Sequence, residues 1–182
     1  MMLTVMSIFG AVATPSVDDY LAQARLVRVN NDVRTIATSM VRLFNDVGAE
    51  RRLPKGWASY DLLVGPGGLP QSADASAEEW TKADDATVGH LDHHLIHNGA
   101  GYATPAAPGL GWRGAYLQQP VSTDPWGARF AVNVRAMHTP YADTVVLSAG
   151  PNGVIESPFE RDGLPTSGDD VVGLIASSGL AR

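Results

Sequence analysis

Residues 16–47 read SVDDYLAQARLVRVNNDVRTIATSMVRLFNDV, and this stretch decides the fold class. Its apolar side chains recur every three or four residues, which is the spacing of one face of an α-helix. The repeat consists of Val33, Ile36, Ala37, Met40, Phe44 and Val47, preceded by a similar stripe of Val17, Tyr20, Leu21 and Ala24. The opposite side carries Arg25, Arg28, Asn31, Arg34, Thr35 and Arg42. We therefore expect one long amphipathic helix, which ends where Gly48 adopts a left-handed conformation.

The chain begins with MMLTVMSIFGAVATPSV, an apolar run without a charged residue before Asp18. A membrane-spanning helix needs ~20 apolar residues, so this run is short for that role. Three interpretations remain open: a secretory signal with a cleavage site at residues 11–13, an ordinary core helix, and the remaining part of a membrane helix whose beginning is missing. Pro15 either precedes a helix that Ser16 caps, or it kinks one continuous helix. The long helix is either a stalk or a helix that lies on its own domain.

Beyond the helix the chain contains many glycines and prolines and changes to strand-like patterns. Residues 49–80 are predicted to be mostly loop, and residues 84–98 to form a short helix that Gly99 ends. The predicted strands are residues 130–134 with one solvent-exposed face, the buried residues 144–147, and the short segments 154–155 and 170–175. A helix first and strands later indicate an α+β fold with an antiparallel sheet.

The composition and the motifs exclude several classes of protein. The chain has 182 residues with 13 basic and 19 acidic side chains, a net charge of -6, whereas a nucleic-acid-binding protein normally presents a basic face. It contains no cysteine, which excludes disulfides and zinc–thiolate sites. It also lacks the GxSxG nucleophile elbow and the GxxxxGK[ST] phosphate loop. We therefore expect no catalytic residue, no enzymatic activity and no nucleic-acid partner.

Four histidines lie close together in the stretch HLDHHLIH. They are His90, His93, His94 and His97. On a helix they would share one broad face, and imidazoles at this spacing can bind a transition metal. The alternative is a polar helix face beside a stripe of Val88, Leu91 and Leu95, because the HExxH motif is absent.

Turn chemistry is concentrated between Gly111 and Phe130. Asp124-Pro125-Trp126-Gly127 has the residues of a type I turn, in which the aspartate accepts a backbone amide, proline presets φ and glycine allows the exit. Trp126 would then project over the sheet. Two later loops, residues 148–153 and 167–170, are rich in oxygen ligands and could close on Ca²⁺, although adjacent acids are also common in solvated turns.

Three motifs in this order resemble the major pseudopilin (G-type) of type II secretion systems. They are WRGxYL at residues 112–117, DPWGxxF at residues 124–130 and SxGPNG at residues 148–153. The N-terminal helix, with Pro15 at its kink, is similar to pilin-like helices. The resemblance covers roughly residues 1–48 and 110–172.

The resemblance implies a pilin-like fold, with a long N-terminal helix packed on a small antiparallel sheet. Its parts would be an apolar membrane and assembly half (residues 1–15), an amphipathic half (16–48), a variable loop region with a short helix (49–110) and the sheet with a calcium loop (111–182). Structural turn and packing residues would be Pro15, Trp112, Tyr116, Asp124, Pro125, Trp126 and Gly127. Calcium ligands, carried over by position, would be Asn152, Asp169 and Asp170 with the carbonyl of Leu147, and Ser148 as a further candidate.

As a function, the resemblance implies a non-enzymatic subunit of a periplasmic filament for protein secretion. Such a subunit is anchored once in the bacterial inner membrane with its globular part in the periplasm. Its partners would be copies of itself, other pseudopilins and inner-membrane secretion components. Alternatives are a type IV pilin-like or minor pseudopilin protein, and a secreted metal-binding or hydrolytic domain that uses the histidines at 90–97.

Three features depart from the family pattern. The prepilin leader, a basic segment that ends in glycine and FTLxE, is absent; a start codon assigned too late is favoured over a truncated chain or a relative without this processing. Residues 55–110 are longer and richer in Gly, Ala and His than the corresponding loop of the family. Asn152 replaces the usual aspartate, which removes one negative charge from the expected calcium loop.

Overall fold

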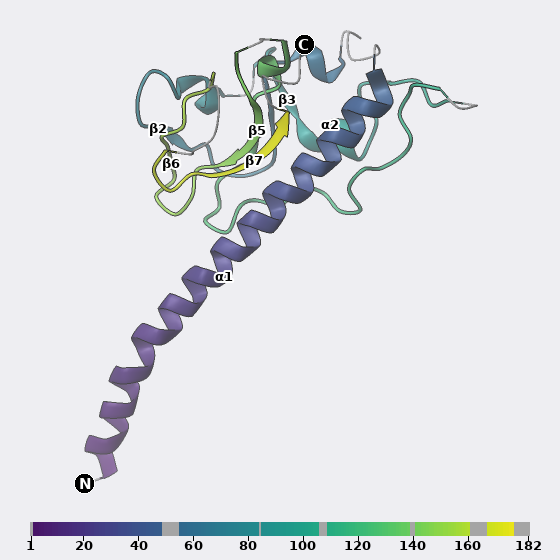
Figure 1. Ribbon diagram of the computed structural model, residues 1–182. Helices are drawn as coiled ribbons and strands as arrows, with labels where there is room; N and C mark the ends of the chain where they lie inside the picture. The colour runs from purple at the N-terminus through teal and green to yellow at the C-terminus, as the bar shows by residue number, and fades with distance from the viewer. Residues whose placement is uncertain are drawn as a thin grey trace.

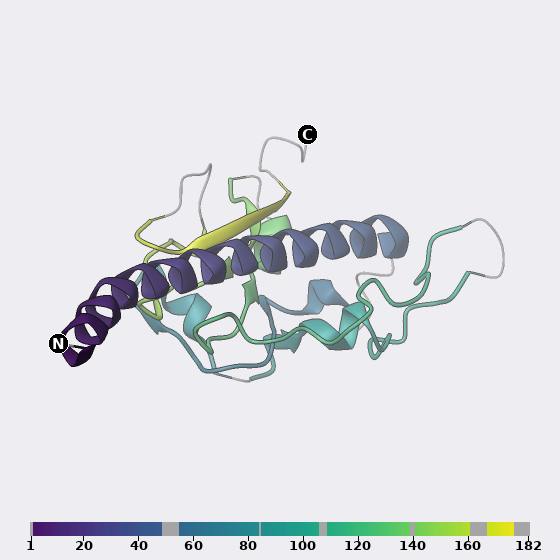
Figure 2. The same ribbon diagram turned by 90° about the horizontal axis from the view of Figure 1, so that it is seen from below.

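The fold is α+β, with one long N-terminal helix packed on a mostly antiparallel sheet. The computed structural model describes residues 2–48, 55–83, 85–105, 109–138, 141–160 and 167–176, and for residues 2–16 it describes the backbone. Figures 1 and 2 show the helix as a rod whose C-terminal half lies along the globular part, while its N-terminal half extends beyond it.

Helix α1 covers Met2–Val47, so Pro15 does not end it, and the second of the two interpretations of Pro15, one continuous helix, is correct. Gly48 follows with φ 44°, the left-handed cap that the sequence predicts. The face that packs on the globular part consists of Val29, Val33, Ile36, Ala37, Met40, Leu43 and Val47. Strand β7 lies close to this face. A Cβ added to Gly173 would lie only 3.0 Å from the Val33 carbonyl oxygen.

The part of α1 from residue 17 to residue 28 has no such cover. The side chains of residues 17–28 are all exposed, including Tyr20 at 73% and Val27 at 58%. Contacts with the globular part begin at Arg28, whose guanidinium donates to the Ser122 hydroxyl (3.3 Å), and at the buried Val29. None of the helices within the described ranges combines the length and apolarity needed to cross a membrane.

The main sheet has five strands in the order β3-β1-β4-β5-β7. Their bounds are Leu62–Val64 (β1), Val88–His90 (β3), Ala131–Val132 (β4), Thr144–Ser148 (β5) and Val171–Ala176 (β7). All neighbours are antiparallel except β1 and β3. A second, two-stranded parallel sheet joins β2 (Gln71–Ser72) to β6 (Val154–Ile155). The predicted strands at 144–147, 154–155 and 170–175 are thus confirmed.

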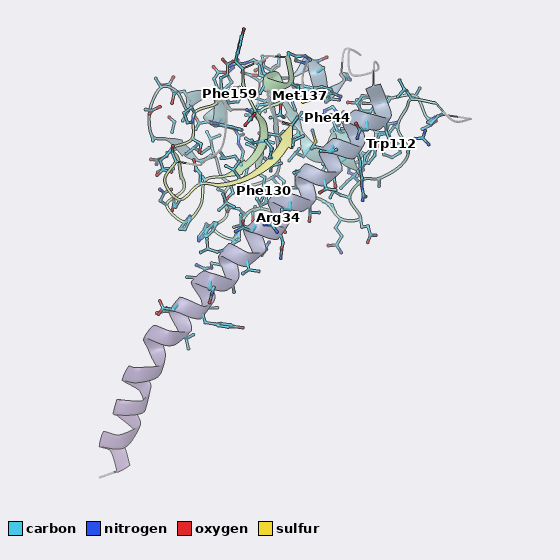
Figure 3. All side chains as sticks on the ribbon, in the orientation of Figure 1. Arg34, Phe44, Trp112, Phe130, Met137 and Phe159 are labelled. Atoms are coloured by element: carbon cyan, nitrogen blue, oxygen red, sulfur yellow. The ribbon has the colours of Figure 1, made fainter. Side chains whose placement is uncertain are left out.

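Alternate residues of the strands face two separate hydrophobic cores. Leu63, Val132 and Val146 point toward α1 and share a core with Phe130. Leu62, Ala131 and Leu147 point to the other face, where Trp80 and Phe159 meet edge to face with ring centroids 4.9 Å apart. Figure 3 labels Phe130 close to the helix and Phe159 in the part of the globule farther from it.

Residues 49–80 were predicted to be mostly loop, and that prediction missed a strand of the main sheet. Strand β1 lies inside this range and pairs with both β3 and β4 in the sheet. Two 3₁₀ helices also lie near it, η2 (Trp57–Ser59) and η3 (Glu78–Thr81). The run Leu62–Val64 is buried on both faces and only three residues long, so it carries no alternation that sequence analysis could detect.

The helix expected over residues 84–98 is reduced to α2, Leu91–Leu95, preceded by β3; residue 84 lies outside the described residues. Parallel pairing of β3 with β1 holds Val88–His90 extended, which overrides the local helical pattern.

The strand expected over residues 130–134, with one solvent-exposed face, was also wrong in part. Strand β4 has two residues, both buried, and η4 (Val134–His138) follows. Asn133, expected to face solvent, is buried because its amide donates to the carbonyls of Asp143 (3.0 Å) and Phe159 (2.9 Å) and its oxygen accepts the Val145 N–H (2.7 Å).

Candidate functional site

The turn at residues 124–127 is built around a buried carboxylate. Asp124 Oδ1 accepts the backbone N–H groups of Trp126 (3.0 Å) and Ala128 (2.8 Å), and the Gly127 N–H donates to the Asp124 carbonyl (3.1 Å). Asp124 Oδ2 accepts the Ser148 hydroxyl (2.7 Å). The aspartate thus fixes the turn as the sequence pattern requires, and it also joins the turn to the end of strand β5.

Residues 112–117 hold the C-terminal end of α1. The Tyr116 hydroxyl donates to Asp46 Oδ2 (3.0 Å), and Arg113 Nε lies 3.4 Å from Asp46 Oδ1. About two helical turns before Asp46, the Ser39 hydroxyl donates to the Tyr116 carbonyl (3.2 Å). Burial raises the pKa of Tyr116 to about 12, and the neighbouring Asp46 carboxylate adds to the effect.

The same segment also contacts α2. The Trp112 indole donates to the His94 carbonyl (3.2 Å), and the Tyr116 N–H donates to the Leu95 carbonyl (2.7 Å). The rings of Trp112 and Tyr116 meet edge to face with centroids 6.0 Å apart. Figure 3 shows Trp112 beside the end of α1 near Phe44. This segment therefore joins the two helices and the loops between them.

Three of the five predicted calcium ligands come together in the structure. The Asn152 N–H donates to Asp169 Oδ2 (3.2 Å), and the Asn152 side-chain oxygen accepts the Val154 N–H (2.7 Å). Asp170 Oδ2 accepts the N–H groups of Glu156 (3.0 Å) and Ser157 (2.7 Å). Burial raises the pKa of Asp170, although these two N–H groups act in the opposite direction.

The other two predicted ligands have different partners. Ser148 is completely buried, and its hydroxyl donates to Asp124. Leu147 lies within β5, where it pairs with Ala131 on one side and Val172 on the other. Both residues belong to the sheet rather than to the loop that contains Asp169.

Glu156, which was not among the predicted ligands, lies beside Asn152 and Asp170. Its Oε1 accepts the Asn152 side-chain amide (2.8 Å). One oxygen on each of three carboxylates is buried without a hydrogen-bond partner in the described part of the chain: Glu156 Oε2, Asp169 Oδ1 and Asp170 Oδ1. In the sequence, Glu156 is visible as an acidic residue directly after the predicted strand at residues 154–155. Its position beside Asn152 becomes clear only once β6 is paired with β2.

The four histidines do not act as one group. His94 is completely buried, its Nδ1 lies 2.9 Å from the Tyr102 hydroxyl, and that hydroxyl accepts the Trp57 N–H (2.8 Å). Burial lowers the pKa of His94 to about 4, with smaller contributions from His93 and His90, so the ring is neutral at neutral pH. His94 is therefore a packing residue between α2 and the loop at 102.

His90, His93 and His97 are exposed around this buried ring. Over the ranges that the structure describes, no three His, Asp or Glu side chains are arranged as the ligands of a metal ion, at the histidines or at the acidic loop. Comparison of the chain with protein-family models, with curated proteins and with solved structures finds no match.

Proposed function

We propose that this chain is a pseudopilin-like structural subunit that assembles through α1 into a filament of a type II secretion system. The observation that carries the proposal is an uncovered apolar stripe on the projecting half of α1. It consists of Val17, Tyr20, Leu21, Ala24 and Val27, all exposed. We call it the outer stripe.

The outer stripe faces away from the chain's own globular part. With 3.6 residues per turn, its centre lies roughly 150° around the helix axis from the centre of the stripe that packs on the sheet. The similar spacing of the two stripes suggests one continuous face. They lie instead on nearly opposite sides of the rod. The sheet cannot cover the outer stripe without a change in the helix.

A contiguous apolar patch of this kind marks an interaction surface. The exposed fractions of Val17, Tyr20 and Leu21 are 54%, 73% and 49%. A second copy of the chain supplies a helix of the same character, and packing of identical helices with the globular parts outside buries every outer stripe at once. The apolar residues before Pro15 extend this rod, and in the proposed monomer they are held by the inner membrane until assembly.

Introduced cysteines test the assembly directly, because the chain has none of its own. Tyr20→Cys is expected to form disulfide-linked dimers and higher species in the full chain under oxidising conditions. Leu69→Cys is the matched control, since Leu69 is 53% exposed on a loop of the globular part. It is expected to remain monomeric on a non-reducing gel.

A charge introduced on the outer stripe provides a second test of self-association. Leu21→Glu is expected to abolish self-association in sedimentation experiments and to leave the melting temperature unchanged, because Leu21 makes no contact that folding requires. Leu69→Glu is expected to change neither property. Self-association that survives Leu21→Glu, or equal cross-linking at Tyr20 and Leu69, would contradict the proposal.

The assignment to secretion rather than to a surface pilus is supported by the motifs at residues 112–117, 124–130 and 148–153. The gene is expected to lie among genes for other secretion components. Pilus-assembly genes at that position would favour the type IV pilin-like alternative, which shares the same architecture.

A further inference from the structure

A pocket lies at the edge of the main sheet where β1 and β3 end and β4 begins. β1 and β3 are parallel, and Val64 pairs with His90 at their carboxyl ends. β4 is antiparallel to β1, so its first residue, Ala131, lies beside Val64 at the same edge. In open α/β sheets, ligands bind in the crevice outside the carboxyl ends of parallel strands, where the following loops diverge. The topology therefore places a candidate binding site here.

The pocket has a volume of about 480 Å³, which is large enough for a small organic molecule. Its apolar lining comes mainly from the end of β1 and the loop after it, and includes Val64, Pro66 and Leu69. Its polar lining comes from the point where β3 leads into α2 (Figure 1) and from the segment before β4, and consists of His90, Asp92 and Arg129. A pocket with apolar walls and a few polar side chains is the usual form of a small-molecule site.

The loop after β1 is held firmly in place at the pocket. The Gly68 N–H donates to the Gly127 carbonyl (2.8 Å), and the Gly68 carbonyl accepts the Arg129 N–H (3.1 Å). Gly67 has φ 133°, and a Cβ added to it would lie 2.7 Å from the carbonyl carbon of Ala128. Only glycine permits both this conformation and this close approach. This wall of the pocket is therefore formed before any ligand binds.

Two side chains of opposite charge are fixed in the lining. Arg129 is 6% exposed, and its guanidinium donates to the carbonyls of Trp80 (3.2 Å) and Lys82. Asp92 Oδ1 accepts the Val121 N–H (2.9 Å), while its Oδ2 accepts no hydrogen bond from any residue that the structure describes. His90 is exposed at the same pocket and adds a ring nitrogen. The pocket thus offers one fixed cation and one fixed carboxylate.

We propose that this pocket binds a free amino acid with an aliphatic side chain. The carboxylate of the ligand binds at Arg129 and His90, and its ammonium group donates to Asp92 Oδ2. The aliphatic side chain packs on Pro66 and Leu69. Asp92 disfavours a ligand with negative charge alone, and Arg129 disfavours one with positive charge alone, so the pair selects a molecule that carries both. This inference does not depend on the filament proposal.

Calorimetry on the full chain tests both charges from the side of the ligand. L-leucine is the probe and is expected to bind at a single site. Leucinamide lacks the carboxylate and isocaproate lacks the ammonium group, so each is expected to bind about tenfold more weakly or worse. Arg129 is left unchanged, because its guanidinium also holds the carbonyls of Trp80 and Lys82. Absence of leucine binding, or equal affinity for the three compounds, overturns the proposal.

Asp92→Asn tests the residue assigned to the ammonium group. Asparagine can still accept the Val121 N–H, so the variant is expected to fold as the parent chain does. Its affinity for L-leucine is expected to fall about tenfold or more, because the charge-assisted hydrogen bond is lost. Isocaproate is expected to bind this variant more tightly than it binds the parent chain, because the repelling carboxylate is gone.

Asp85→Asn is the matched control for this substitution. Asp85 also accepts a backbone N–H, that of Thr87 (2.6 Å), but it does not line the pocket. Its affinity for L-leucine is expected to equal that of the parent chain. A merely structural role of Asp92 would weaken leucine and isocaproate alike, and that result, or unchanged leucine affinity in Asp92→Asn, contradicts the proposal.

Leu69→Ala tests the position of the aliphatic side chain. Leu69 is 53% exposed, so the substitution is expected to leave the melting temperature nearly unchanged. The affinity for L-leucine is expected to fall severalfold, while that for glycine, which has no side chain to pack there, is expected to stay the same. Leu174→Ala on β7, with Leu174 44% exposed, is the control and is expected to bind both as the parent chain does. An equal loss for leucine and glycine, or no loss for leucine, overturns this orientation of the ligand.

Discussion

At the scale of single residues, buried polar side chains connect segments of the globular part through hydrogen bonds. Asp124 is 2% exposed, and its carboxylate accepts two backbone N–H groups and one hydroxyl. Asn133 similarly ties β5 to the loop at Phe159. Hydrogen bonds to a buried charged group contribute about 1.5–3 kcal/mol each, which explains why a short polar motif can fix the position of a whole segment.

His94 is expected to make the stability of the protein dependent on pH. Its pKa is about 4 in the folded chain and 6.5 in the unfolded chain, so between these values the unfolded state binds more protons. The contribution is therefore complete above pH 6.5 and is lost as the pH falls from 6.5 to 4, by roughly 3 kcal/mol. Unfolding by urea across this range measures the loss.

The matched variants separate His94 from the carboxylates, which also titrate in acid. His94→Gln, which retains a polar group for Tyr102, is expected to show a flatter slope of unfolding free energy between pH 6.5 and 4. His97→Gln, at an exposed position, is expected to keep the slope of the parent chain. Equal slopes for all three proteins would show that His94 does not carry the effect.

At the scale of elements, the contact between α1 and β7 sets the position of the helix on the sheet. Val33 and Gly173 meet backbone to backbone, and glycine is the residue that allows this distance. The hydrogen bond from Tyr116 and the ion pair with Arg113 at Asp46 hold the C-terminal end of the same helix. The two contacts together fix where the rod leaves the globular part.

Gly173→Val is expected to push α1 away from the sheet and to destabilise the fold by about 1–3 kcal/mol, as overpacking of a core does. The melting temperature and the urea midpoint measure the effect. Leu174→Ala is the control in the same strand, because Leu174 is 44% exposed, and it is expected to change stability by less than about 0.5 kcal/mol. A neutral Gly173→Val would mean that the helix position is not set at this contact.

At the scale of the whole molecule, the protein consists of a folded globular part that includes the second half of α1, and a projecting rod. Every side chain from 17 to 27 is exposed, and the buried helix face starts at Val29. In the proposed subunit, folding and assembly therefore depend on different halves of the same helix.

A chain that begins at residue 25 is expected to retain the stability of the full chain to within about 0.5 kcal/mol, because the side chains of residues 17–24 are all exposed. It is also expected to lose self-association, which sedimentation measures. A chain that begins at residue 34 is the control, since it lacks Val29 and Val33 and is expected to unfold at much lower urea concentration. Strong destabilisation of the first fragment would show that the projecting half takes part in folding.

Much of the fold is predictable because its signals are local. The repeat in residues 16–47, the buried run at 144–147 and the turn at Asp124 depend on residues that lie close together in the chain. The loop with Asn152, Asp169 and Asp170 is likewise visible as two oxygen-rich segments. These features were therefore determined by the sequence itself.

Tertiary structure alone decided the features that depend on distant residues. β1 is a strand because β3 and β4 lie on either side of it, not because Leu62–Val64 has a strand pattern. Glu156 reaches the loop with Asp169 through the pairing of β6. His94 is a packing residue because the rings of Tyr60 and Tyr102 lie against it. The proposal that the outer stripe is an interaction surface also depends on tertiary structure, since the sheet covers one side of α1 and leaves the other exposed.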